Sequence, residues 1–378
     1  MGRILCATAV ALLTFAGSSS LEASEELSPL LHLDVQHQDG RVIPVSVVRT
    51  IDGKGVKRFP GVAGAALSPS GDEIAFVDES LNLVSLDDAR RTTIKPRDLK
   101  IRGERFFPSG PSWSPDGKRI AAITVVLGRT VGDNQWAVGV FDTKSGTQSS
   151  RHPVPLDTAA GCPYCMAAVN KFRWSPDGAR ILLSWGNTIV IDVESKRTNV
   201  VSATWSSAEW GDGGNVVYFF EVGREPGVMQ LKGFYATDLA SGKRELLLAA
   251  DSLADSEITH SAFVHIPLLN STYDCKQLVI NSDVEGDGTM LRFYDLSKQD
   301  PPDLRKPDKT TKVAETMPQV VWSPSGRSIA AIAASEWEVF KLMRFDLTTD
   351  EWSVVANLAL GDDTPPEAFA FKVLSWAK

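Results

Sequence analysis

Short apolar runs follow turn signatures along most of the chain. In residues 113–123, Trp113 precedes Ser-Pro-Asp-Gly, and the apolar run Ile-Ala-Ala-Ile follows shortly afterwards. Serine suits the first position of a type I turn, proline presets φ at the second, and glycine fits the fourth. A short apolar run without a helical period, introduced by such a turn, is typical of a strand buried on both faces. The stretch therefore predicts a strand, a turn and a second, buried strand.

This unit recurs along the chain with the same internal order. Clear copies lie at residues 67–77, 113–123, 174–183 and 322–332, and two degenerate copies lie at 210–219 and 271–280. The three best copies share core and turn residues, which are Trp113, Pro115, Gly117, Trp174, Pro176, Gly178, Trp322, Pro324 and Gly326. After each copy a second apolar run ends in aspartate, at Asp87, Asp142, Asp192, Asp238, Asp295 and Asp346. Sheet units that recur every 36–61 residues and cannot bury their faces alone predict a radial array.

We therefore predict an all-β fold, a β-propeller of four-stranded blades. The recurring turn would join the first and second strands, and the run that ends in aspartate would be the third. The repeat Trp-Ser-Pro-Asp-Gly-Lys-x-Ile-Ala is similar to that of TolB-type propellers. It also resembles the repeat in the propeller domains of the prolyl oligopeptidase and dipeptidyl-peptidase families. The resemblance covers residues 60–350 and implies a TolB-like, WD-type propeller fold rather than a particular function.

The two ends of the chain predict how the ring closes. Residues 30–58 are strand-like and precede the first copy, whereas residues 369–376 resemble a first strand cut off at its turn. We predict a seventh blade in which the C-terminus supplies the inner strand and the N-terminus the outer three. Such closure leaves no full-length exposed edge. The alternative is six blades with irregular tails.

The N-terminus has the pattern of a secretory signal peptide. A short basic start precedes an apolar run at residues 4–17, and small residues lead to a plausible cleavage site after Ala23. The run is too short to span a bilayer, although a membrane anchor is the alternative. We predict a signal peptide at residues 1–23, a single propeller domain at 24–378, and a periplasmic or secreted protein.

Composition and missing motifs limit the function. The net charge is −8 and no basic stripe is present, which argues against nucleic acid and anionic membranes as partners. No Gly-x-Ser-x-Gly elbow, phosphate-binding loop or dinucleotide fingerprint occurs. We therefore expect a monomer without a cofactor that is not an enzyme.

Long insertions predict where a partner binds. Residues 124–135 and 221–232 would be loops between the second and third strands of two blades, and residues 150–169 and 250–261 would join blades. In a propeller all four lie on the face opposite the recurring turns, and long loops often carry function. We predict a scaffold that binds a protein or peptide on this face, near the central funnel. A propeller that binds a small ligand is an alternative.

The cysteines offer the other candidate site. Cys162 and Cys165 form Cys-Pro-Tyr-Cys within an insertion, and an exported protein favours a disulfide between them. The same tetrapeptide occurs at glutaredoxin active sites, and Met166 could complete a soft-metal site, so redox and metal-binding functions are alternatives. Cys275 stands where a recurring turn has glycine, and we expect it to be free.

Other candidate residues carry weaker signals. Residues 283–288 imitate the start of a calcium loop, but Tyr294 stands where the bidentate glutamate belongs, so we expect a hairpin turn. His260 and His265 flank a predicted inner strand and could line the funnel. Trp136 and Trp337 lie near loop ends and are candidates for exposure.

Overall fold

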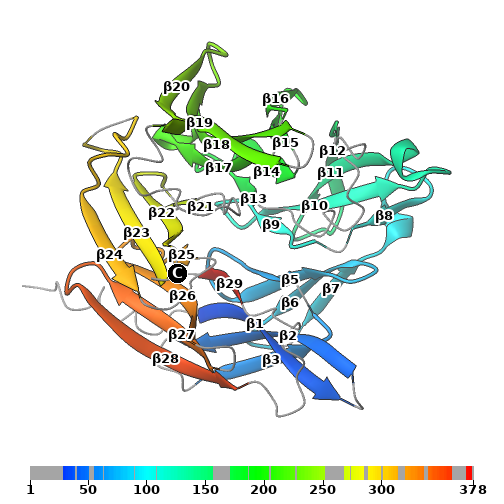
Figure 1. The fold of residues 1–378 in the computed structure, drawn as a ribbon. Helices are drawn as coiled ribbons and strands as arrows, with labels where there is room; N and C mark the ends of the chain where they lie inside the picture. Colours follow the sequence, from blue (N-terminus) through cyan, green and yellow to red (C-terminus); the bar gives the residue numbers. More distant parts are fainter. Residues whose placement is uncertain are drawn as a thin grey trace, which may run out of the picture.

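The chain folds into a ring of seven antiparallel β-sheets, the blades of a propeller (Figure 1). The computed structural model describes residues 29–38, 41–50, 55–62, 64–88, 90–107, 109–155, 171–185, 187–203, 206–225, 228–251, 268–272, 274–284, 288–298, 301–313, 320–335, 339–359 and 372–376. Within these residues, no helix has the length and apolar character needed to cross a membrane. The all-β fold and the seven blades predicted from the sequence are confirmed.

The first three blades follow the chain from the innermost strand to the outermost. Blade 1 consists of β4 (Ala66–Leu67), β5 (Glu73–Val77), β6 (Leu81–Ser85) and β7 (Arg91–Ile94). Blade 2 consists of β8 (Glu104–Phe106) and β9 (Ser112–Trp113), which both pair with β10 (Arg119–Val126), followed by β11 (Gln135–Asp142) and β12 (Gln148–Pro153). Blade 3 consists of β13 (Lys171–Trp174), β14 (Arg180–Trp185), β15 (Asn187–Asp192) and β16 (Thr198–Ser202).

The next three blades repeat this order. Blade 4 consists of β17 (Ser206–Gly211), β18 (Val216–Glu225), β19 (Val228–Asp238) and β20 (Arg244–Ala249). Blade 5 consists of β21 (Leu268–Ser271), β22 (Gln277–Val284), β23 (Gly288–Asp295) and β24 (Lys309–Val313). Blade 6 consists of β25 (Val320–Trp322), β26 (Ser328–Ser335), β27 (Val339–Asp346) and β28 (Glu351–Ala359).

Both termini build the seventh sheet, which we call the closure blade. Its order is β29 (Lys372–Trp376), β1 (Pro29–Gln38), β2 (Arg41–Thr50) and β3 (Val56–Pro60), so the C-terminal strand is innermost as predicted (Figure 1). Leu30 packs in a cluster with blade 6, and Leu31 packs in a cluster with blade 1. Because neighbouring strand residues point to opposite faces, one strand contacts both adjacent blades. The six-blade alternative is wrong.

The recurring turns form as the sequence predicts. Gly117 N–H donates to the Ser114 carbonyl at 2.9 Å, and Arg119 N–H donates to Ser114 Oγ at 2.9 Å. Gly117 has φ 68°, a left-handed conformation that glycine adopts without a steric cost. Cys275 occupies the same position with φ 57°, where a non-glycine residue is strained by about 1–2 kcal/mol.

Tryptophans of the recurring unit connect four of the blades to the blade before them. In four blades the indole N–H donates to the carbonyl just before the corresponding position of the preceding blade. The pairs are Trp113 with Ala66 at 3.1 Å, Trp174 with Ser112 at 2.9 Å, Trp210 with Arg173 at 3.4 Å, and Trp322 with Asn270 at 3.0 Å. The tryptophans are therefore inter-blade contacts as well as core residues.

Three features differ from the expectations. The loop predicted at residues 221–232 is wrong, because residues 221–225 and 228–232 belong to the paired strands β18 and β19, and Val222 and Leu231 are buried against blade 5. Trp136 is also not exposed, since it lies in the core between blades 2 and 3 with 4% of its surface accessible. The connection between β23 and β24, described at residues 296–298 and 301–308, lies on the face of the recurring turns and is anchored by buried Leu304.

Candidate functional site

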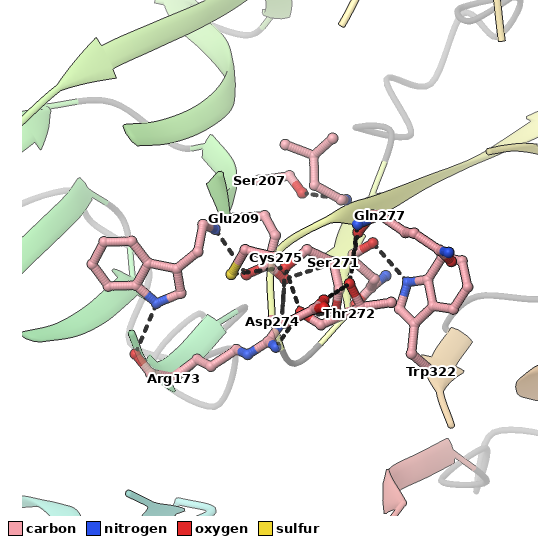
Figure 2. A network of polar contacts seen from close by, with 12 residues as sticks. Arg173, Ser207, Glu209, Ser271, Thr272, Asp274, Cys275, Gln277 and Trp322 are labelled. Atoms are coloured by element: carbon pink, nitrogen blue, oxygen red, sulfur yellow. Dashed lines mark hydrogen bonds and ion pairs between the residues drawn. The ribbon is translucent and has the colours of Figure 1, made fainter. Parts of the chain in front are cut away.

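A polar network joins the inner strands of blades 3, 4 and 5 at the centre of the ring (Figure 2). Arg173 comes from β13, Glu209 from β17 and Ser271 from β21, while Thr272 and Cys275 belong to the turn after β21. Arg173 and Glu209 each precede the tryptophan of their own unit, so their side chains point away from that tryptophan and toward the next blade. Both side chains therefore extend toward blade 5.

Arg173 spans two blade–blade interfaces. Its Nη1 donates to the Ser271 carbonyl at 3.0 Å and to Ser271 Oγ at 3.2 Å, and its Nη2 donates to the Thr272 carbonyl at 2.9 Å. Nη1 also lies 3.2 Å from Glu209 Oε2. The planar guanidinium presents several donors in a fixed geometry, which suits it to bind two carbonyls and a carboxylate together.

The carboxylate of Glu209 is fully buried, with 0% of its side chain exposed. Oε1 accepts the Trp210 N–H at 2.9 Å, and Oε2 accepts the Ser271 N–H at 3.2 Å in addition to the Arg173 contact. A buried charge is tolerated when a partner of opposite charge and hydrogen bonds satisfy it. We call Arg173, Glu209 and Ser271 the inter-blade clamp.

The clamp stands where the tryptophan contact is missing. Blade 5 carries Ser271 at the position of the recurring tryptophan, so no indole connects it to blade 4. Instead, the Ser271 N–H binds Glu209 and the Ser271 carbonyl binds Arg173. The charged pair thus replaces one indole hydrogen bond with several charge-assisted bonds.

Cys275 lies beside the clamp but has no reactive character. Its side chain is buried, and Ser271 Oγ lies 3.7 Å from its Sγ. Burial raises the pKa of the thiol to about 11, so it stays protonated and a poor nucleophile at neutral pH. Cys275 is a free cysteine, as predicted. The clamp holds charge in place and contains no group poised for proton transfer or nucleophilic attack.

Blade 2 contains a second buried ion pair. Glu104 Oε1 lies 2.7 Å from Arg151 Nε and accepts the Thr124 hydroxyl at 2.7 Å. On the other side of β12, Ser150 Oγ and His152 Nε2 are 2.7 Å apart, and burial lowers the pKa of His152. The Glu104 and His152 side chains are fully buried, whereas 14% of the Arg151 side chain is exposed.

The predicted site residues have different outcomes. Three tryptophans of the recurring units lie in contacts between blades, and three glycines lie in the turns with left-handed φ, namely Trp113, Trp174, Trp322, Gly117, Gly178 and Gly326. Val284 pairs with Gly288 at the end of a hairpin, in agreement with the expected turn. Among the described residues, no group of three or more His, Cys, Asp and Glu side chains could hold a metal ion. Other predicted features lie outside the described residues, namely the signal peptide at residues 1–23, Cys162, Cys165, Met166, His260, His265 and Trp337.

Sequence reasoning missed the clamp, although a signal was present. The residue before the recurring aromatic position is small or uncharged in blades 1, 2, 5 and 6, at Ala66, Ser112, Asn270 and Val321. In blades 3 and 4 it is Arg173 and Glu209. Opposite charges at one repeat position in consecutive units, followed by a unit without tryptophan, mark this contact.

The comparisons with known proteins support the fold. No family model and no curated protein matches the chain. Among solved structures, the acylaminoacyl peptidase of Pyrococcus horikoshii is 12% identical with a TM-score of 0.57, covering 87% of this chain and 52% of that one. A puromycin hydrolase is 14% identical with a TM-score of 0.56, covering 90% and 55%. The propeller domain of the Trilobed protease from Pyrococcus furiosus is 12% identical with a TM-score of 0.54, covering 89% and 100%.

The fold and these similarities define a seven-bladed β-propeller of the kind found as a domain in peptidases. The chain spans about half the length of the acylaminoacyl peptidase and the puromycin hydrolase. A TolB structure from Acinetobacter baumannii is also similar, at 13% identity and a TM-score of 0.43. The expectation that the protein is not an enzyme is contradicted, because several similar chains are enzymes, matched through their propeller domains.

Proposed function

We propose that the protein is an exported propeller scaffold that binds a protein or peptide partner on the face opposite the recurring turns. The observation that carries the proposal is that the connections between the second and third strands of blades 2 and 4 are enlarged on that one face. The equivalent connections of blades 1 and 3 are short: residues 78–80 in blade 1, and residue 186 in blade 3. Rigid scaffolds commonly present binding residues on such loops.

The blade 2 loop, residues 127–134, is ordered by its own hydrogen bonds. Gly128 N–H donates to Asn134 Oδ1 at 2.9 Å, and Thr130 Oγ1 donates to Asp133 Oδ2 at 2.9 Å. Leu127 nevertheless leaves 53% of its surface exposed. A structured loop with an exposed apolar side chain can bind a partner at a small entropic cost.

The blade 4 hairpin is the second enlarged element. β18 and β19 contain 10 and 11 residues, whereas β14 and β15 contain 6 each. Burial of Val222 and Leu231 against blade 5 fixes the base of the hairpin. The blade 2 loop and this hairpin therefore project from the same face at fixed positions.

The test is peptide selection on the immobilised protein. Random-peptide display should enrich binders, and two shortened variants should lose them: residues 127–134 replaced with Asn-Gly, and residues 224–229 replaced with Asn-Gly. Asn-Gly supports a tight hairpin, so the blades should stay intact. Lys118→Ala, on an exposed recurring turn of the opposite face, is the control and should keep binding. If both shortened variants bind the selected peptides as well as the unchanged protein does, this surface is not the binding site.

A second candidate function is a role within a hydrolase. It is favoured by the similarity in fold to the acylaminoacyl peptidase, a match that covers 87% of this chain. Fluorogenic aminoacyl and acylaminoacyl substrates would test it. Turnover that co-purifies with the protein and survives in both shortened variants would support this candidate over the scaffold.

A further inference from the structure

Among the described residues, the closure blade lacks the indole hydrogen bond that joins most other neighbouring blades at the centre of the ring. Four blade–blade interfaces contain an indole hydrogen bond, and the interface of blades 4 and 5 contains the clamp. The two remaining interfaces flank the closure blade. Blade 1 has Leu67 at the tryptophan position, and the buried Nε1 of Trp376 finds no acceptor among the described residues.

A histidine is buried in the same blade without a hydrogen bond. His32 lies in β1 with 0% of its surface exposed, and both ring nitrogens lack a partner within the described part of the chain. Its backbone pairs with Val47 of β2 and with Val373 of β29. An imidazole in this position is held neutral by desolvation, because the charged form would have neither water nor a partner.

The surroundings of His32 oppose its protonation from every described side. His32 shares a strand face with Leu30, and that face packs on the apolar side chains of Ala330, Ile332, Phe340, Leu342 and Leu358 of blade 6. The charged groups that act on His32 are Arg49 of β2 and Arg58 of β3, which are both cationic. Burial first, and then these two arginines, lower the pKa of His32 from 6.5 to about 3.

We propose that the closure blade detaches at low pH. Protonation of His32 separates β1 and β29 from blade 6, and this separation opens the ring. The proton comes from solvent once the strand has moved, and the imidazolium is then hydrated outside the apolar interface. Release is local because, within the part of the chain that the structure describes, neither flanking interface has an indole hydrogen bond or an ion pair like that of Arg173 and Glu209. The blades that carry those contacts stay closed.

The direction of the effect follows from proton binding. The released strand has the ordinary histidine pKa of 6.5, whereas the closed blade has a pKa of about 3. The released state therefore binds more protons between these values, and the closed state loses stability as the pH falls through that window. At pH 4.5 the opening equilibrium constant should be about 100-fold larger than at pH 7.5.

Hydrogen–deuterium exchange with peptide resolution tests the proposal on the full chain. Exchange in residues 29–38 and 372–376, corrected for the intrinsic pH dependence, should rise about 100-fold between pH 7.5 and pH 4.5. Blades 2 to 5 should keep their protection. If all blades lose protection together, or if the closure blade keeps its protection at pH 4.5, the proposal is wrong.

Variants identify the group that is responsible. His32→Leu and His32→Phe should each abolish the acid-dependent rise while keeping protection at pH 7.5. His152→Leu is the matched control, since His152 is also fully buried with a lowered pKa but lies in blade 2. It should leave the response of the closure blade unchanged. If the two His32 variants fail to fold, the wild-type pH series still decides, because local and global opening differ in which peptides exchange.

Discussion

The guanidinium of Arg173 lies 3.0 Å from the carbonyl oxygen of Ser271, although 98 residues separate the two in the chain. Arg173 starts in blade 3, passes over the inner strand of blade 4 and reaches blade 5. On its way it neutralises the buried carboxylate of Glu209. One side chain thus connects three blades. Among the described residues, the interface of blades 4 and 5 is the only one in the run from blade 2 to blade 6 that lacks an indole hydrogen bond.

Removal of Arg173 should destabilise the ring strongly. Arg173→Leu leaves Glu209 buried without its cation, and breaking such a pair costs about 3 kcal/mol of unfolding free energy. Adding Glu209→Gln removes the unpaired charge, so the double variant should recover part of the loss. Urea denaturation measures both, with Lys243→Ala as the control, because the exposed Lys243–Glu245 pair should contribute less than about 1 kcal/mol. Equal effects of Arg173→Leu and Lys243→Ala would contradict the clamp.

The contribution of an indole hydrogen bond to the free energy of unfolding should be measurable by comparing variants at two tryptophans. Trp322→Phe loses the hydrogen bond to the Asn270 carbonyl at 3.0 Å, at a cost of about 1 kcal/mol beyond the change in packing. Trp376→Phe removes an indole that has no acceptor among the described residues and should cost less. Chemical denaturation of the two variants checks the difference. A larger loss for Trp376→Phe would argue against this account of the closure blade.

Cys275 should resist thiol reagents in the folded protein. Its burial and its pKa, raised to about 11, keep the thiolate scarce at pH 8. In a Cys6→Ser/Cys162→Ser/Cys165→Ser background, we expect labelling by an aromatic disulfide reagent to be at least 100-fold slower than in urea. Rapid labelling under native conditions would show that the turn after β21 is open.

Replacing Cys275 by glycine and by alanine separates two opposing effects. The left-handed φ of 57° disfavours any side chain, whereas the buried thiol contributes packing beside Trp210. Cys275→Ala keeps the backbone strain and loses the packing, so it should destabilise by about 1 kcal/mol. Cys275→Gly relieves the strain and should be the more stable of the two variants. Thermal unfolding gives the order, and the reverse order would contradict the strain.

The Cys162–Cys165 disulfide inferred from the sequence stays a prediction. Protein purified from its exported form should show one free thiol before reduction and two more afterwards, with no bound metal. Stoichiometric zinc or copper would instead make residues 162–166 a metal site. Ready exchange of the pair with glutathione would make them a redox site.

Local chemistry explains what could be predicted from the sequence. The turn at residues 114–117 depends on neighbouring residues, and the strand that ends at Asp142 depends on its own apolar run and the turn after it. The closure was also predictable, because an inner strand at the C-terminus and outer strands at the N-terminus complete one sheet. These features need only short-range geometry and a repeat count.

Only the tertiary structure decided the contacts between blades. Arg173 meets Ser271 because the ring brings three inner strands within reach of one side chain. Residues 221–225 and 228–232, predicted from the sequence to belong to a loop, are paired strand ends because blade 5 buries Val222 and Leu231. Trp136 is buried for the same kind of reason, since blade 3 covers it. Local turns and strand pairing are set by residues close together in the chain, whereas burial and charge pairing depend on which distant surfaces the closed ring brings together.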